Sequence, residues 1–599
     1  MKFKSLSFMT CLFAVMFVLL SSTIARAAEP FGVLSLGSYK SLEKTTIQIG
    51  DMLDNPQMGM MFQALDGVFG PEFLEGFDKS KPMGAALYAD SKDKTKVFPL
   101  IFIPQKDSGA LVNRIAEYQE GLEINEEFKE GDLTLIQMNF ESMSLFVRDF
   151  NGWTFLSTES KALVNLPKNP EKLLGDMGEK YTLGLKLDLD KMPKEIKEFL
   201  LDQFKQGMDV AQAVQKMKAE DLEDSDDSDD SDQSPLEKLQ ALSANQQMSF
   251  EEIKTLVEES KVLVIGIGAD KNNIFVQTYY ESIPDSEMGK TMTALADAKP
   301  YVNCLLPEAS LTAASVTRNL PSAIEKSKKQ ISELKDLIFE SLEEEGVTDK
   351  MDSEKLQKAK KLADKSEELI IKLLDQSGKQ NVKGGIAFFF QPDKVSIVSA
   401  NPDCNVYEMD KLIKEWVNLA VSEDDAKDVI NWDAETWEGL KFSTFTFSVE
   451  KIKNWLKENA EEKAEQMGKQ LDKMFGKTIV LAYAHSDKDF YFAAGKDSVE
   501  LIKTVVKNDK AQIPAGIQSY VTISLGQILE TIAQFQAIDE SIRDQFSMVA
   551  TSAKGDDNED KIIFKASYGK NSTTGTMEMQ KGIVRALNAL MMIYAMNNM

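Results

Sequence analysis

The chain contains a single histidine, His485, and this scarcity limits the chemistry that it can perform. A general base near neutral pH is normally a histidine, so Ser-His-Asp and Cys-His catalytic designs are disfavoured. Because zinc sites are built mostly from His and Cys ligands, a zinc centre is disfavoured as well. His485 lies in the polar segment AHSDKD, which we interpret as an ordinary surface turn.

Carboxylates are the abundant functional groups, with 96 Asp and Glu side chains. A pair of carboxylates could hydrolyse a polymer, but nothing in the sequence positions a particular pair. The segment VIGIGAD carries Gly266 and Gly268 without the third glycine of a dinucleotide fingerprint, so it predicts a strand and turn. We therefore predict no catalytic residue and no cofactor, and a carboxylate-based hydrolase of an extracellular or envelope polymer is the alternative.

Residues 220–235 form a Ser/Asp tract, EDLEDSDDSDDSDQSP. Calcium prefers carboxylate oxygens, so the tract holds the only candidate metal ligands that the sequence suggests. These are Asp224, Asp226, Asp227, Asp229 and Asp230. An ordered calcium loop alternates its ligands around a glycine, and the tract has none. Since it also has almost no apolar residue to bury, we interpret it as a disordered, exposed loop.

Residues 1–27 match a secretory signal peptide, with a basic start, an apolar run over 8–20 and a small-x-small site at 25–27. The run is shorter than the roughly 20 residues that a membrane span needs. We expect an exported chain, periplasmic or extracellular, with no membrane span after cleavage. Cleavage removes three basic and no acidic residues, so the net charge goes from −27 to −30, which opposes nucleic-acid binding.

Two cysteines, Cys304 and Cys404, lie outside the predicted signal peptide. An exported compartment permits a disulfide between them, which would close a long loop. Two buried thiols are the alternative interpretation, and a count of two excludes a disulfide-framework fold.

The elements that surround these residues occur twice along the chain. Residues 151–196 and 488–532 each show an aromatic strand, a small polar turn, an amphipathic helix, and then a strand led by Tyr181 or Tyr520. The hairpin of GAALYA and VFPLIFI recurs near residues 384–400. We predict an α+β fold of two homologous tandem domains, residues 28–300 and 301–599, with mainly antiparallel sheets covered by helices.

Long charged helices predicted over residues 320–376 depart from this repeat. Their apolar residues follow one helical stripe, and Gly346 interrupts them, which predicts a projecting helical hairpin in the second domain. The segment LNALMMIYAM, residues 587–596, belongs to a methionine-rich chain. It is too short to span a bilayer, so we interpret it as a packed helix.

The segments SLGSYKSLEK, VFPLIFIPQKD, FNGWTFLSTESKAL and YTLGLKLDLDKMPKEI follow one another in the first half. In this order they resemble a group of exported bacterial proteins of the domain-of-unknown-function type. The resemblance implies a signal peptide and α+β repeats, and it supplies no catalytic residue. The acidic tract and the helices over residues 320–376 depart from the pattern of that group.

Taken together, these features predict an exported, non-enzymatic binding or structural protein. Duplicated sheets and apolar helices would form a cleft or an interaction surface for an apolar ligand or a protein partner.

Overall fold

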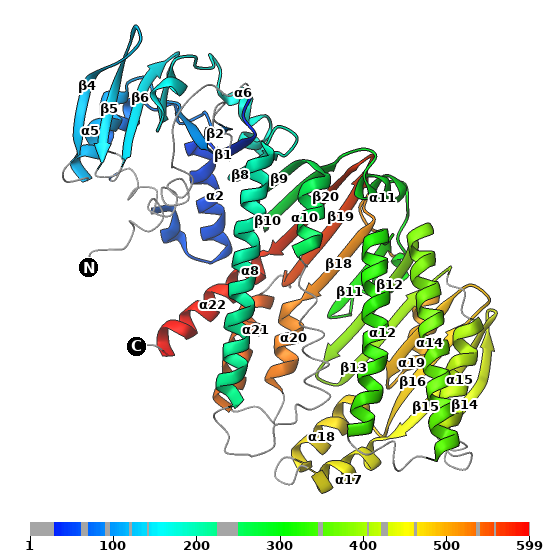
Figure 1. Cartoon of the computed structure of the whole chain (residues 1–599). Coiled ribbons are helices and arrows are strands. Elements are labelled where there is room, and N and C mark those ends of the chain that lie inside the picture. The colour runs from blue at the N-terminus through cyan, green and yellow to red at the C-terminus, as the bar shows by residue number, and fades with distance from the viewer. Residues whose placement is uncertain are drawn as a thin grey trace. The chain divides into compact units, whose positions relative to one another are not determined.

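A computed structural model describes residues 29–60, 67, 70–89, 96–118, 122–140, 143–223, 250–344, 352–403, 407–420, 429–459, 464–534, 540–555 and 559–597. The chain divides into two compact units, Met1–Ser282 (unit 1) and Ile283–Met599 (unit 2). Each unit combines an antiparallel sheet with helices (Figure 1), which confirms the predicted α+β class. The signal-peptide region, residues 1–27, lies outside the described residues.

The described part of unit 1 holds ten antiparallel strands in the order β4-β5-β6-β7-β3-β2-β1-β8-β9-β10. Their bounds are β1 (Gly32–Leu36), β2 (Met83–Ala89), β3 (Val97–Ile103), β4 (Glu123–Glu130), β5 (Leu133–Phe140), β6 (Met143–Phe150), β7 (Trp153–Ser157), β8 (Leu183–Asp188), β9 (Ser260–Ala269) and β10 (Asn273–Ser282). The helices are α2 (Tyr39–Met52), α4 (Pro71–Gly76), α5 (Ser108–Tyr118), α6 (Glu171–Leu174), α7 (Met177–Lys180), α8 (Lys194–Glu223) and α10 (Phe250–Glu259), with 3₁₀ turns η1 (Pro56–Gly59) and η2 (Ser160–Leu163).

Unit 2, within its described residues, has ten antiparallel strands in the order β14-β15-β16-β17-β13-β12-β11-β18-β19-β20. Their bounds are β11 (Leu311–Thr317), β12 (Val382–Gln391), β13 (Lys394–Asn401), β14 (Ile430–Trp437), β15 (Leu440–Ser448), β16 (Thr478–His485), β17 (Phe490–Gly495), β18 (Ser519–Ser524), β19 (Lys561–Gly569) and β20 (Ser572–Gln580). The helices are α11 (Glu287–Leu295), α12 (Pro321–Glu344), α14 (Ser353–Lys379), α15 (Tyr407–Ala420), α17 (Val449–Asn459), α18 (Ala464–Phe475), α19 (Ser498–Lys507), α20 (Leu525–Ala533), α21 (Glu540–Lys554) and α22 (Lys581–Asn597), with the 3₁₀ turn η3 (Val302–Cys304).

The strand order is the same in both units when β1 is matched with β11, β2 with β12, and so on to β10 and β20. This is the element order that the sequence repeat indicates. A common origin of the two units stays a prediction, since shared topology alone does not establish it.

Local sequence signals explain where several helices and strands begin and end. Asn151 and Gly152 both adopt positive φ, 53° and 81°, so they form the tight two-residue turn that joins β6 to β7. Ser38 begins α2, where its hydroxyl accepts a hydrogen bond from Ser41 N at 3.2 Å. Asp352 begins α14 in the same way, with its carboxylate accepting from Glu354 N at 3.1 Å.

Two parts of the predicted repeat differ from the structure. The ten-residue helix α19 follows β17, whereas only η2 and the short α6 and α7 follow β7, because Pro167 and Pro170 lack the N–H groups that a continuous helix needs. Tyr520 lies inside β18, but Tyr181 precedes β8. Tyr181 stacks instead over Gly266, where an added Cβ would lie only 2.3 Å from its ring.

The division between the units also differs from the predicted boundary at residue 300. It falls after Ser282, so α11 belongs to unit 2. Hydrogen bonds explain this: Thr293 Oγ1 donates to Asn571 Oδ1 at 3.0 Å, and Gln518 Nε2 donates to Ala296 O at 2.7 Å. The long helices predicted over residues 320–376 are present as α12 and α14, and Lys335 of α12 pairs with Asp364 of α14 at 2.9 Å.

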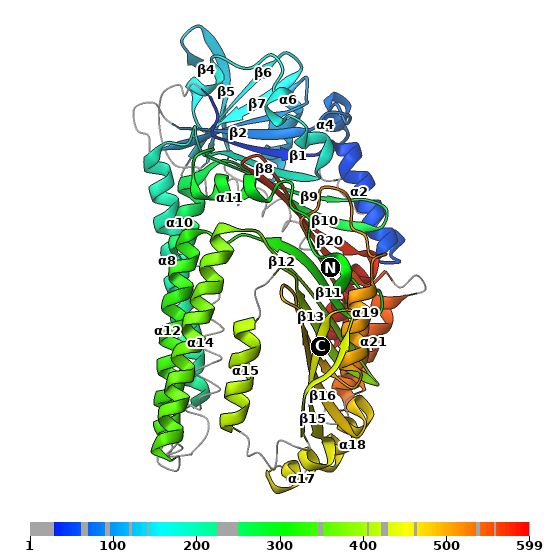
Figure 2. The same cartoon turned by 90° about the vertical axis from the view of Figure 1, so that its right-hand side faces the viewer.

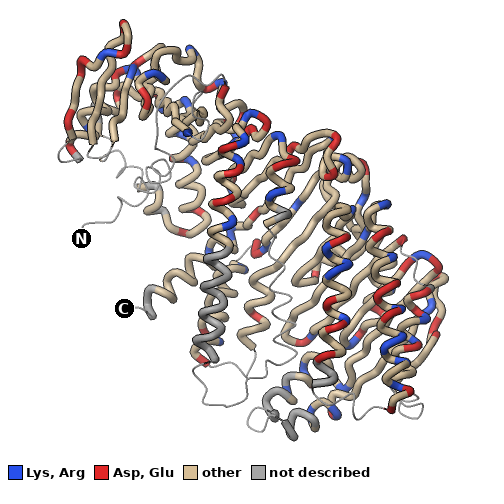
Figure 3. Tube along the Cα trace, viewed as in Figure 1, with Lys and Arg blue, Asp and Glu red and all other residues tan. Residues whose placement is uncertain are grey.

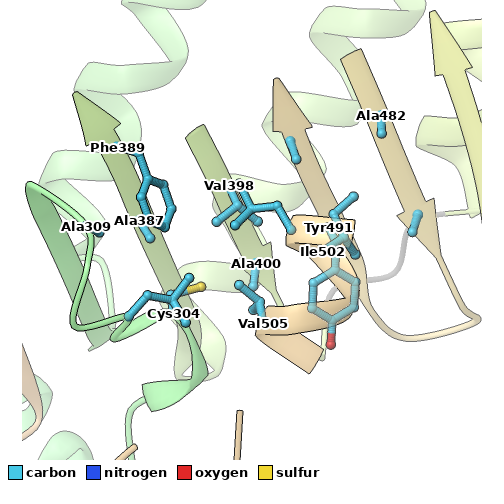
Figure 4. Packing of buried hydrophobic residues seen from close by; sticks show 14 of the residues in the cluster. Cys304, Ala309, Ala387, Phe389, Val398, Ala400, Ala482, Tyr491, Ile502 and Val505 are labelled. Atoms are coloured by element: carbon cyan, nitrogen blue, oxygen red, sulfur yellow. The ribbon is translucent and has the colours of Figure 1, made fainter. Parts of the chain in front are cut away.

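The core of unit 1 is built on aromatic residues of adjacent strands. Phe102 and Phe155 are fully buried, with ring centroids 6.4 Å apart, and Trp153 meets Phe102 edge-on at 5.9 Å. In unit 2, small strand residues such as Val398 and Ala400 let α19 approach closely, and its Ile502 is fully buried (Figure 4). Burial of these side chains is the main term that stabilises each unit.

Cys304 is fully buried in the unit 2 core and has no disulfide partner among the residues that the structure describes. It lies against Gly385, where an added Cβ would come within 2.8 Å of the Cys304 Cβ. Burial raises the pKa of the Cys304 thiol to about 12. Cys404 lies outside the described residues, so the disulfide between them stays a prediction.

Cys304 should react with iodoacetamide at pH 8 at least about a thousandfold more slowly than an exposed thiol, because its thiolate is scarce and shielded. A Cys404→Ser variant isolates this thiol, and mass spectrometry measures its labelling before and after unfolding. Rapid labelling of the folded variant would contradict the burial. In the wild type, labelling in denaturant only after reduction would establish the disulfide.

Candidate functional site

The sheet of unit 2 carries a row of directly opposite apolar residues, one from each of its ten described strands. In strand order they are Ile430, Phe445, Leu481, Ala494, Ile397, Phe388, Leu311, Ile523, Ile562 and Met579. Opposite residues in antiparallel pairs point to the same face, so these side chains form one continuous line, which we call the apolar row. Ten strands spaced by about 4.8 Å make it roughly 40 Å long.

Every residue of the apolar row is partly exposed. On β12, β13 and β17 the residues next to those of the row point to the other face, where Ala387, Val398 and Ala493 are fully buried in the cluster that α19 joins. Further aromatic side chains extend the row on its own face. Phe390 stacks on Phe388 at 5.9 Å, and Phe447 is 41% exposed. The strands of unit 2 carry few charged residues, whereas α12 and α14 carry many of both signs (Figure 3).

Helix α15 covers one end of the row. Its Met409 and Ile413 pack on the cluster around Tyr483 and Phe490, which also includes Phe445 of the row. Figure 2 shows α12, α14 and α15 on one side of the strands and α19 on the other. Helix α14 holds α15 in place: Lys365 pairs with Glu415 at 2.8 Å, and other contacts join the two helices. The row residues over β11–β13 therefore face the side on which the helical hairpin lies.

A polar cluster fixes α15 to the sheet. Tyr483 Oη donates to Asp410 Oδ1 at 2.7 Å, and Lys414 Nζ lies 3.0 Å from Asp410 Oδ2. Lys414 also approaches Asp433 Oδ2 at 3.5 Å. Burial, together with the bond to Asp410, raises the pKa of Tyr483, so its hydroxyl stays protonated and remains a donor. Both oxygens of Asp410 are thus occupied by protein groups.

His485 belongs to this cluster, and its predicted position in a surface turn is wrong. It is the last residue of β16, with its side chain only 11% exposed and its ring stacked 6.2 Å from that of Tyr483. Its Nε2 lies 3.6 Å from Asp410 Oδ1. The alternation of Leu481, Tyr483 and His485 is the sequence signal that indicates a shared, covered face. The arrangement stabilises a helix on a sheet.

The other sequence-predicted sites are not assembled in the described residues. Asp224, Asp226, Asp227, Asp229 and Asp230 lie outside them, although the backbone of α8 continues to Glu223, so the start of the predicted loop is helical. Across the described ranges, no group of three or more His, Cys, Asp or Glu side chains could hold a metal. Gly266 and Gly268 lie in β9, where they make room for aromatic rings.

A separate cavity of about 210 Å³ lies between α20 and α21. Its charged residues, Glu530 and Lys554, pair with each other, so it offers little to a charged ligand. Among the described helices, none is long and apolar enough to cross a membrane.

No protein-family model matches the chain, and no curated protein matches it. Two solved structures, crystal forms III and IV of TP0453, show a weak similarity. Form III is 8% identical with a TM-score of 0.20, over 43% of this chain and 79% of the TP0453 chain. Form IV is 9% identical with a TM-score of 0.20, over 46% and 88%. Similarity at this level supports no inference about what the chain does.

Proposed function

We propose that the chain is an exported, non-enzymatic binding protein, and that unit 2 binds an elongated apolar ligand along the apolar row. The observation that carries this proposal is the row itself: ten consecutive strands contribute an apolar side chain to one face, and all ten remain partly exposed. Export rests on the signal-peptide features of residues 1–27.

The pattern is unusual for a sheet of this kind. Antiparallel sheets commonly bury one face and present polar residues on the other. Here the second face is apolar as well, and a large exposed apolar surface is typical of a binding site. In unit 1 part of the corresponding side is covered, because Met192 and Ile196 near the start of α8 pack on the buried Leu87 of β2. Leu34 of β1 and Leu185 of β8 remain partly exposed there.

The alternative, a carboxylate hydrolase, has less support. The buried carboxylates Asp410 and Asp560 accept hydrogen bonds from Tyr483 and Ser524, at 2.7 Å and 2.6 Å. These bonds occupy the carboxylates with protein donors and give them a structural role.

Replacing Ile397 by Asp should weaken ligand binding at least tenfold, because a charge in the middle of the row opposes apolar contact. The probe is cis-parinaric acid, a fluorescent long-chain fatty acid, titrated into the mature chain. Ile338→Asp on α12 is the matched control, since Ile338 is 46% exposed and belongs to α12, not to the sheet. Circular dichroism checks that both variants fold.

Saturable binding by the wild type and the control, with loss in Ile397→Asp, is the expected result. Absence of saturable binding of both cis-parinaric acid and the apolar dye 1-anilinonaphthalene-8-sulfonate would contradict the proposal. Equal affinity in all three proteins would show that any bound probe lies elsewhere.

A further inference from the structure

Helix α22 is apolar on two sides. One side is buried against α21 and α20 through Ile583, Ala586, Ala589 and Ile593. The other side is exposed, so the interpretation of this segment as simply a packed helix is incomplete. A helix that is apolar all round is normally enclosed on all sides, which raises the question of what covers the exposed side.

The exposed residues form a single stripe, which we call the outer stripe. It consists of Leu587, Leu590, Met591 and Tyr594, which are 47%, 45%, 63% and 73% exposed. Their spacing of three, four and seven positions places them on one face of the helix. Met592, 53% exposed, widens the stripe.

The charge of α22 differs from that of the rest of the chain. Its sequence, KGIVRALNALMMIYAMN, contains no Asp or Glu, in a chain that has 96 of them. Its charged residues are Lys581 and Arg585, and Arg585 Nε donates to Ser552 O at 3.0 Å. The helix itself therefore adds no negative charge that a phosphate-bearing surface would repel.

The size of the outer stripe argues against a second copy of the chain as its partner. A standard protein interface uses roughly 20–30 residues on each side. The outer stripe and Met592 together supply only five. Insertion into the surface of a bilayer needs only a short apolar face, and methionine and tyrosine suit the boundary between headgroups and acyl chains. The helix cannot cross the bilayer, so it would lie parallel to the surface.

We propose that the outer stripe of α22 docks the protein onto the surface of a phospholipid bilayer. Apolar side chains enter the boundary region, and the net charge of −30 of the mature chain keeps the rest of the molecule at a distance from anionic headgroups. The proposal does not depend on the apolar row, but the two fit together, because an apolar ligand partitions into bilayers.

Flotation of the mature chain with phosphatidylcholine vesicles tests this proposal. We expect the wild type to float with the vesicles and Met591→Asp to bind at least tenfold more weakly, with Leu587→Asp showing a similar loss. Ile338→Asp is again the control and should float like the wild type. Replacing a third of the lipid by phosphatidylglycerol should weaken binding at low salt, because the chain and the headgroups repel each other.

Three results would overturn the proposal: no flotation of the wild type, equal flotation of Met591→Asp and wild type, or a dimer in light scattering that Met591→Asp dissociates. The last result would assign the stripe to a second copy of the chain. Thermal unfolding checks that the exposed substitutions leave the fold intact. Ile397→Asp should float normally, so failure of membrane docking and failure of ligand binding are distinguishable.

Discussion

Replacing Phe155 by Ala should lower the free energy of unfolding of unit 1 by about 3–5 kcal/mol. Phe155 lies on β7, which pairs with β3 and β6; its side chain is fully buried, and its ring lies 6.4 Å from that of Phe102. Removing it takes away apolar burial and leaves a cavity that its close-packed neighbours cannot fill. Hydrogen-exchange mass spectrometry of the folded protein measures the loss, because each peptide reports on one unit.

Phe442→Ala is the matched change in unit 2, where Phe442 is also fully buried. We expect it to weaken protection in residues 283–599 by a similar amount while residues 29–282 keep theirs. Phe155→Ala should show the reverse pattern. If either substitution lowered protection equally throughout the chain, the two units would unfold as one, and the division into separate compact units would have no energetic meaning.

Replacing Asp410 by Ala should lower the free energy of unfolding of unit 2 by about 2–3 kcal/mol. The substitution leaves the buried Tyr483 hydroxyl without its acceptor at 2.7 Å and leaves Lys414 without its partner at 3.0 Å. Water can partly reach Lys414, which limits the free energy lost when its partner is removed. Chemical denaturation of wild type and variant measures the difference.

Tyr483→Phe is the control for this cluster, since it removes one donor and leaves the ion pair with Lys414. This substitution should lower the free energy of unfolding by about 1 kcal/mol. The double variant then gives the coupling between the two side chains, and a coupling near zero would contradict the hydrogen bond. If Asp410→Ala lowered the free energy of unfolding by no more than Tyr483→Phe does, the ion pair with Lys414 would contribute nothing to stability.

Much of the fold could be predicted from local patterns. The alternation in VFPLIFI and in LKFSTFTF indicates strands, and Asn151-Gly152 indicates the turn between β6 and β7. The repeated order of elements correctly matches β2 and β3 with β12 and β13, and the strand after Tyr181 with the strand that holds Tyr520, because each hairpin is encoded locally. It does not separate β19 from β20, because STTGTMEMQ shows little apolar alternation. Strands β4 and β14 could not be found in this way, since EINEEFKE and INWDAETW show little apolar alternation. Their extended state is imposed by pairing with β5 and β15.

The candidate site was harder to predict for a different reason. Each strand shows which of its residues alternate, but the apolar row exists only when ten strands are aligned in register. The sequence also does not show which face α19 seals and which face stays open. The burial of His485 cannot be predicted from the sequence for the same reason. It comes from α15, whose residue Asp410 is distant from His485 in the sequence.

The two poorly predicted strands have a consequence for behaviour at high concentration. Strands β4 and β14 each end their sheet, and each contains a register shift, between Asn125 and Phe128 and between Asn431 and Glu435. Four of the eight residues of β4 are acidic, and β14 carries Asp433 and Glu435. Asp433 within the second shift adopts positive φ, 50°. An irregular, charged outer strand is a poor template for a strand from another molecule. These strands should therefore prevent the sheets from growing into fibres, and the acidic residues that make them hard to recognise would keep the protein free of aggregates.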